Sequence, residues 1–125
     1  MPVKFRFQDL EIWRLAIEVA DLLFDVADEL EAKKLYRFAE QLRGAALSAP
    51  NNIAEGSGSV SKREFTQFLN IARRSTFENA NMLILFDRKH LITGLRRDQF
   101  LERLDHLSRK ITSFQRTLTG KEHGA

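Results

Sequence analysis

The sequence contains no cysteine, which excludes disulfide bonds and metal sites built from thiolates. Proline occurs only twice, and of the two only Pro50 interrupts a helical pattern. No segment shows the alternation of apolar and polar residues that is typical of a strand. These absences favour a helical protein that depends on packing alone for its stability.

Long apolar runs are also missing. None approaches the roughly 20 residues that are needed to span a bilayer, and the segment Met1–Arg6 lacks the apolar core of a signal peptide. We therefore expect a cytoplasmic protein with no membrane contact. The chain has 125 residues, of which 43% are hydrophobic, and this suffices for one domain with a buried core.

Charge is distributed unevenly along the chain, although its net value is only +3. Residues 9–31 hold eight acidic residues and one basic residue, whereas residues 32–125 hold 17 basic and nine acidic residues. This asymmetry has two interpretations. The basic part binds an anionic partner, or the acidic and basic segments pack beside one another, within one chain or between subunits.

Apolar residues recur at helical spacing in four segments, at about residues 9–31, 34–56, 62–90 and 94–118. Asp9 stands where the first helix needs an N-cap, and Ser61 with Glu64 forms a capping box before the third helix. These features predict an all-α protein. We expect a single up-and-down four-helix-bundle domain over residues 1–125.

The first expected helix carries two apolar stripes. The second stripe consists of Ile12, Leu15, Val19, Leu22 and Val26. A bundle helix with one buried face needs only one stripe, so a lone bundle would expose the second as a patch large enough to drive association. We therefore predict that these residues form part of the subunit interface of a ring-like homo-oligomer.

Pro50 lies inside the second helical pattern, and Leu42 and Ile53 keep helical spacing on either side of it. Proline removes a backbone hydrogen bond and costs roughly 3 kcal/mol inside a helix. Because the register continues, we predict one helix kinked at the proline. Three polar residues follow it: Asn51, Asn52 and Glu55. They either bind a partner or satisfy backbone groups around the proline and the following loop.

The segment around the proline also resembles a known family. The resemblance is carried by Ser48, Pro50, Asn51, Asn52, Ile53, Ala54, Glu55 and Gly56, together with Phe7–Trp13, Gln41–Arg43 and Glu64–Phe65. Here the chain resembles the four-helix-bundle proteins encoded by intervening sequences in 23S ribosomal RNA genes, whose fold the accessory variability determinant of diversity-generating retroelements shares. The resemblance implies a barrel-like homopentamer and binding of nucleic acid. The chain departs from the family pattern between Thr76 and Met82.

Candidate catalytic and metal-binding groups are few. Asp87 with His90, and Glu102 with His106, have helical spacings, but a di-iron carboxylate site needs a second such pair and two further inward-facing carboxylates. The sequence also lacks a glycine-rich phosphate loop and a nucleophile elbow. We therefore expect no enzymatic activity, no catalytic residue, no metal and no cofactor, and we interpret both pairs as charge pairs on helix surfaces.

The third expected helix has a polar face opposite its core stripe. This face carries Arg63, Asn70, Arg74, Asn81 and Arg88, with Lys62 and Arg73 on its flank and Phe77, Ile84 and Leu85 beside it. Arginine and asparagine suit contacts with phosphates and base edges, and an aromatic ring suits stacking. Three interpretations stay open: a nucleic-acid site, an oligomer interface built on the three apolar residues, and a plain solvated surface.

We therefore predict a non-enzymatic homo-oligomer, a pentamer by resemblance, that binds RNA or DNA through basic residues of its second and third helices. The alternative is a protein-interaction scaffold. Its partner would be a nucleic-acid-processing enzyme, a nucleoprotein or a reverse-transcriptase-like protein. Affinity that falls linearly with the logarithm of salt concentration would favour the first, and salt-insensitive binding to a protein would favour the second.

Overall fold

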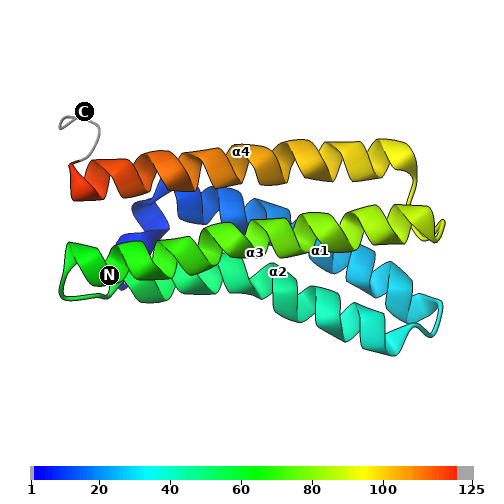
Figure 1. The fold of residues 1–125 in the computed structure, drawn as a ribbon. Coiled ribbons are helices and arrows are strands. Elements are labelled where there is room, and N and C mark those ends of the chain that lie inside the picture. The colour runs from blue at the N-terminus through cyan, green and yellow to red at the C-terminus, as the bar shows by residue number, and fades with distance from the viewer. Residues whose placement is uncertain (1, 121–125) are drawn as a thin grey trace.

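The computed structural model describes residues 2–120 and contains four long helices (Figure 1). They are α1 (Glu11–Ala32), α2 (Tyr36–Ser57), α3 (Lys62–Arg88) and α4 (Gly94–Thr119), preceded by the short 3₁₀ helix η1 (Arg6–Asp9). Residues 2–120 contain no strand. The predicted all-α, four-helix architecture is confirmed, and each helix begins and ends within two residues of its expected position.

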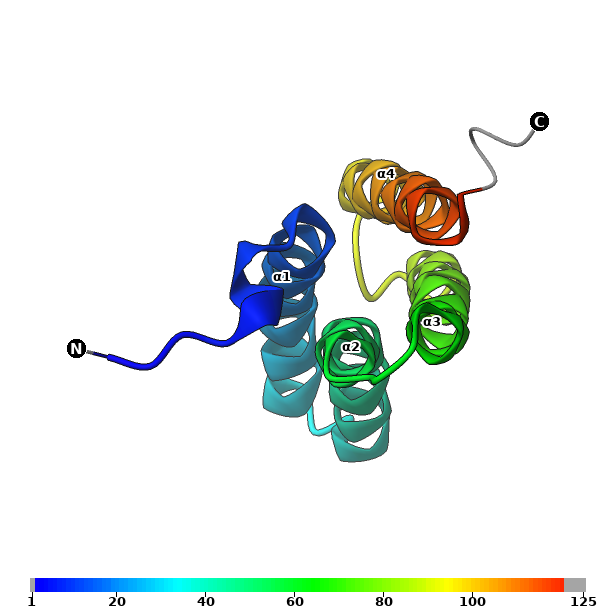
Figure 2. The same ribbon diagram turned by 90° about the vertical axis from the view of Figure 1, so that its left-hand side faces the viewer.

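Successive helices run in opposite directions and lie side by side, so the chain forms an up-and-down bundle (Figures 1 and 2). α2 packs against both α1 and α3, and α4 packs mainly against α3. α1 and α4 share a smaller interface, which closes the bundle less tightly on that side. The N-terminal segment extends away from the bundle beside α1 (Figure 2).

The start of α1 differs from its prediction. Leu10 is the N-cap residue, and no side chain caps the helix. Asp9 belongs to η1 instead, where its Oδ1 atom lies 2.6 Å from Nζ of Lys4. The hydrogen bond and the positive charge of Lys4 lower the pKa of Asp9. The Asp9 carboxylate is therefore paired with a neighbouring cation and does not serve the helix amides.

The N-termini of α3 and α4 have side-chain caps. Ser61 Oγ accepts a hydrogen bond from the Glu64 amide at 3.1 Å, which confirms Ser61 as the N-cap of α3. Thr93 Oγ1 accepts from the Arg96 amide at 3.1 Å in the same way. In both cases an exposed N–H group of the first turn gains a partner next to it in the chain, which is why the local sequence predicts these ends well.

Two turns explain why the expected ends of the second and third helices are shifted. Lys34 and His90 have left-handed φ values of 65° and 59°. After each of them the chain bonds back to the preceding helix: the Leu35 amide donates to the Leu30 carbonyl at 2.9 Å, and the Leu91 amide to the Phe86 carbonyl at 2.8 Å. This is the Schellman motif, which glycine usually completes. Neither position holds glycine, so the sequence carries no signal for it.

The core consists of two apolar clusters that follow one another along the bundle. Leu23, Leu42 and Leu83 belong to one, and Ile53 and Leu69 to the other. On α3 the clusters are separated by three buried polar residues: Ser75, Thr76 and Asn79. The middle of α3 is therefore both buried and polar.

The second apolar stripe of α1 is not exposed. Ile12, Val19 and Val26 are only 4%, 4% and 1% exposed, and Leu15 and Leu22 are half-buried. α1 contacts both α2 and α4, so it buries a wider face than a helix with a single neighbour does. The prediction that this stripe forms an exposed patch is therefore wrong, because these side chains pack in the core of their own chain.

α2 is one helix that continues through Pro50, whose side chain is buried. The register on both sides of the proline predicts this continuity correctly. Gly56 lies in the last turn of this helix. A Cβ atom on Gly56 would lie 2.7 Å from Cβ of Phe68 and 2.8 Å from Cδ1 of Phe65. The glycine thus permits close packing of α2 on α3.

Candidate nucleic-acid interface

The outer surface of α3 presents the predicted polar residues together. Lys62, Arg63, Asn70, Arg74, Asn81 and Arg88 are exposed, and Arg73 is half-buried. We call these seven residues the α3 basic face. Arg73 Nη2 donates to Oδ1 of Asn70 at 3.0 Å, one turn away. The amphipathic sequence of α3 dictates this arrangement, because Phe65, Leu69 and Leu83 turn the opposite side of the helix into the core.

The cations of the α3 basic face have no ion-pair partner within residues 2–120. Several cations of α4 differ in this respect. Arg96 Nη1 donates to Oε1 of Glu29 at 2.7 Å, and Arg109 Nε lies 3.0 Å from Oδ2 of Asp105. The hydrogen bond between Arg96 and Glu29 raises the pKa of the former and lowers that of the latter. The α3 cations therefore remain available to an external anion.

Three apolar side chains lie beside the α3 basic face. Phe77 is 62% exposed, Ile84 42% and Leu85 45%. A small pocket of about 200 Å³ lies next to Phe77, between α3 and α4. These three residues are exposed as the prediction of an oligomer interface requires, in contrast to the α1 stripe. The same exposure suits stacking of the Phe77 ring on a base.

The segment that carries the family resemblance forms a polar connection between α2 and α3. Asn52 Nδ2 donates to the Ser48 carbonyl at 2.8 Å, and the hydroxyl oxygens of Ser48 and Ser75 lie 2.6 Å apart. Ser75 Oγ donates to the Ile71 carbonyl at 2.9 Å, so the proton between the two serines comes from Ser48. Asn52 and Ser48 are thus engaged within the chain, whereas Asn51 and Glu55 are exposed.

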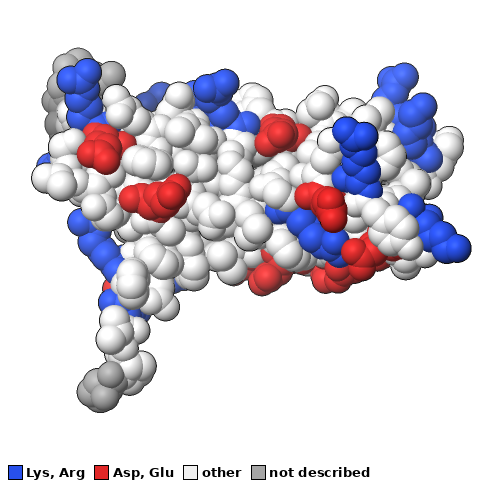
Figure 3. Space-filling view, turned by 90° about the horizontal axis from the view of Figure 1, so that it is seen from below, with Lys and Arg blue, Asp and Glu red and all other residues white. Residues whose placement is uncertain are grey.

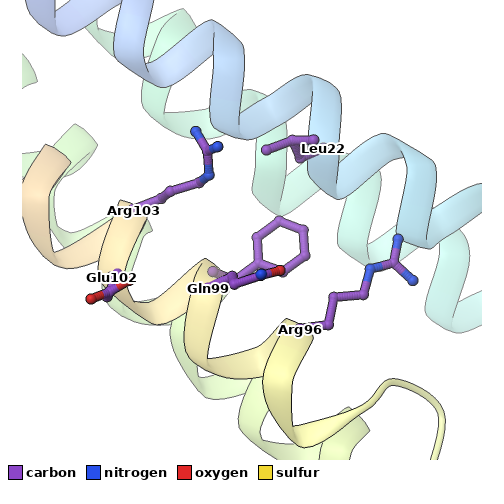
Figure 4. A pocket seen from close by; sticks show the side chains of 6 residues that line it. Leu22, Arg96, Gln99, Glu102 and Arg103 are labelled. Atoms are coloured by element: carbon purple, nitrogen blue, oxygen red, sulfur yellow. The ribbon is translucent and has the colours of Figure 1, made fainter.

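A separate cleft of about 450 Å³ lies between α1 and α4, and sequence patterns did not indicate it. In Figure 4, Arg96 and Arg103 extend from α4 toward α1, on either side of Gln99, and Leu22 faces them from α1. Arg96 is bound by Glu29. The cleft exists because α1 and α4 share a small interface, which only the tertiary arrangement reveals. No residue of α3 lines it.

The carboxylate of the first pair considered for metal binding, Asp87 with His90, has a different partner. Oδ2 of Asp87 accepts a hydrogen bond from Nη1 of Arg97 on α4, and His90 is exposed in the turn after α3. Within residues 2–120, no group of three or more histidine and carboxylate side chains is arranged to hold a metal ion. No helix in this part of the chain is long and apolar enough to cross a membrane.

Comparison with known proteins agrees with the resemblance seen at Ser48–Gly56. No curated protein shows a significant match to the chain. The family model described as 23S rRNA-intervening sequence protein matches residues 8–113. This match runs from η1 through α1, α2 and α3 into α4, and so it covers the α3 basic face. The chain therefore belongs to the 23S rRNA-intervening sequence protein family.

Proposed function

We propose that this protein binds RNA or DNA through the α3 basic face, as a non-enzymatic, cytoplasmic homo-oligomer. One observation carries the proposal. Five cations of a single helix have no carboxylate partner in residues 2–120, whereas Arg96, Arg97 and Arg109 of α4 are all paired. When cations without a partner in the protein bind a nucleic-acid backbone, they displace the counterions that are condensed on its phosphates. The release of these counterions favours binding. Backbone contacts carry no base information, so the binding is largely tolerant of sequence.

Assembly would multiply this surface. With the α1 stripe assigned to the core, Phe77, Ile84 and Leu85 remain as the exposed apolar candidates for subunit contacts. They lie in the second half of α3, which leaves the half from Lys62 to Arg74 open to a ligand. In a ring, for which the family resemblance implies five subunits, each copy repeats this weak site. Several weak sites on one ring bind a long polyanion by avidity.

The proposal also includes a bend of α2 at Pro50. The proline has no N–H to donate to the Ala46 carbonyl, and its ring crowds that carbonyl. A bend there would set the direction of the first half of α2, and with it the distance between α2 and neighbouring subunits.

Charge reversal on the α3 basic face tests the function. We expect Arg63→Glu/Arg74→Glu to lose about tenfold or more of the affinity for labelled single-stranded RNA and for duplex DNA at about 50 mM salt. Loss of two phosphate contacts should also reduce the slope of log affinity against log salt by about 1.4 for a single strand and 1.8 for a duplex. Fluorescence anisotropy at about 50 and 200 mM salt measures both quantities.

The matched control carries the same charge change on α4. Arg109→Glu/Arg116→Glu alters two exposed arginines outside the proposed site and should keep most of the affinity. Light scattering establishes that both variants assemble as the wild type does. Equal losses in the two variants would show that only total charge matters, and no binding by the wild type at low salt would refute nucleic-acid binding altogether.

A further inference from the structure

A groove runs between α2 and α3 and borders the α3 basic face, with which it shares Asn81. Its volume is about 600 Å³, and we call it the α2/α3 groove. Gly44 and Ser48 line it from α2, and Glu78 and Met82 line it from α3. No basic side chain lines it. Its volume exceeds that of the cleft between α1 and α4, and of the seven residues of the α3 basic face Asn81 alone is in its lining.

Gly44 is not explained by the packing of its own chain. A Cβ atom added there would meet no atom within 4 Å, in contrast to Gly56, where one would collide with two phenylalanines. Glycine inside a helix lowers helix stability relative to alanine. At Gly44 this cost brings no contact within residues 2–120. A glycine on a helix surface, which has no Cβ atom, allows the backbone of another segment to approach closely.

The lining of the groove is mixed in polarity, and an apolar side chain of each helix lies in or beside it. Leu47 is 41% exposed and lies one turn after Gly44 on α2, and the half-buried Met82 lines the groove from α3. Residues three apart are neighbours on a helix surface. A floor of small residues on α2, with Leu47 and Met82 beside it, suits the apolar stripe of an amphipathic helix.

The charge of the groove indicates which kind of partner it favours. The carboxylates of Glu40 and Glu78 line it, and neither has an ion-pair partner in the described part of the chain. Figure 3 views the molecule from the side on which α2 lies: much of this face is uncharged, acidic groups are spread over it, and most basic groups lie toward its ends and edges. The two glutamates of the groove would repel the exposed Asp21 and Asp25 of α1 in a second copy of the protein, which disfavours docking of that helix in the groove.

We propose that the α2/α3 groove is a docking site for an amphipathic helix of a partner protein, whose stripe of small and apolar residues is flanked by lysine or arginine. The helix lies along the groove with its backbone close to Gly44, its apolar side chains against Leu47 and Met82, and its cations at Glu40 and Glu78. This inference does not rest on nucleic-acid binding, because the residues of the groove and those of the Lys62–Arg74 half of α3 are different.

Designed peptides serve as the probe. One labelled helical peptide carries a stripe of leucine and alanine at i, i+3, i+4 and i+7 flanked by lysines, and a second replaces every lysine with glutamate. The lysine peptide should bind the wild type at least tenfold more tightly than the glutamate peptide does. Glu40→Lys/Glu78→Lys should reverse this preference. Anisotropy titration measures the affinities, and equal binding of the two peptides to the wild type, or binding of neither, would overturn the proposal.

Gly44→Leu places a side chain in the groove at a position where a Cβ atom meets no atom within 4 Å, and it should weaken binding of the lysine peptide at least tenfold while the melting temperature does not fall. His106→Leu adds the same side chain to an exposed position of α4 and should change nothing. Retained binding by a folded Gly44→Leu variant would overturn the proposal. So would a loss of subunit assembly in Gly44→Leu, because a second copy would then occupy the groove. Arg63→Glu/Arg74→Glu should still bind the peptide, which separates this proposal from the nucleic-acid one.

Discussion

Two glycines of the same helix should respond in opposite directions to the same substitution. Gly44 and Gly56 both lie within α2, and helix propensity alone predicts that alanine stabilises at either position. Their surroundings differ. A Cβ atom at Gly44 meets nothing within 4 Å, whereas one at Gly56 falls 2.7 Å from Cβ of Phe68. We therefore expect Gly44→Ala to stabilise the protein and Gly56→Ala to destabilise it.

The magnitude at Gly44 follows from propensity. Alanine in the interior of a helix is about 0.8–1.0 kcal/mol more favourable than glycine, and no steric term opposes this gain. The entropy of unfolding is about 0.26 kcal/mol per kelvin for 125 residues near 60 °C. A gain of about 1 kcal/mol therefore raises the melting temperature by about 4 °C.

At Gly56 the steric term decides the sign. The contact is with Cβ of Phe68, which cannot move without its backbone, and with the Phe65 ring in the core. Inserting a methyl group into such a well-packed site costs about 1–3 kcal/mol. The propensity gain is smaller here, because Gly56 lies in the last turn of α2. We therefore expect Gly56→Ala to lower the free energy of unfolding by about 1–2 kcal/mol, and the melting temperature by about 4–8 °C.

Urea denaturation followed by circular dichroism measures both free energies. Wild type and variants are compared at one protein concentration, because the proposed assembly would make stability depend on concentration. An unchanged m-value shows that the unfolded state is the same in each. A Gly56→Ala variant as stable as the wild type would show that α2 and α3 are not as close there as the structure places them. A destabilised Gly44→Ala variant would show that the position is packed.

Three further predictions concern the proline, an ion pair and a turn. Pro50→Ala should keep the helix content and change subunit assembly, measured by light scattering; unchanged assembly and melting temperature would mean that the proposed bend has no structural role. Folding lowers the pKa of Glu29 below its ordinary value of 4.5, so its pairing with Arg96 stabilises above about pH 4.5 and is lost as the pH falls through the folded value. Because the Glu29 side chain is 50% exposed, Glu29→Gln should lower the free energy of unfolding by only about 0.2–1 kcal/mol at pH 7, and by less at about pH 3. Urea denaturation at the two pH values measures this, and an equal loss at both would contradict the prediction. Lys34→Gly should raise the free energy of unfolding by about 0.5–1 kcal/mol, because φ is 65° at that position. Lys33→Gly, where φ is −88°, should not raise it in the same measurement.

Much of the fold could be read from local patterns. The spacing of Leu23, Leu42 and Leu83 within their helices predicts which side of each is buried, because an α-helix repeats every 3.6 residues whatever surrounds it. Ser61 predicts the start of α3 because its hydroxyl serves an amide three residues away. The α3 basic face could be predicted for the same reason, since its exposed side lies opposite a stripe that is visible in the sequence.

Other features could not be predicted, because they depend on neighbours that are distant in the chain. The width of the buried face of α1 depends on contacts with both α2 and α4, so the pattern of apolar residues alone wrongly predicts an interface at Ile12, Val19 and Val26, which lie in the core. Arg96 and Glu29 are 67 residues apart, and no periodicity links them. The free cations of α3 are likewise identified only once every carboxylate has a position.

By itself, the sequence determined the number of helices, their inward sides and the polar character of the outer surface of α3. Each of these follows from interactions within about one helical turn. The tertiary structure alone decided which apolar stripe is buried, which charges are neutralised, and why one glycine of α2 is enclosed and the other is open. These depend on how four helices pack against each other, and packing brings together side chains whose separation in the chain carries no signal.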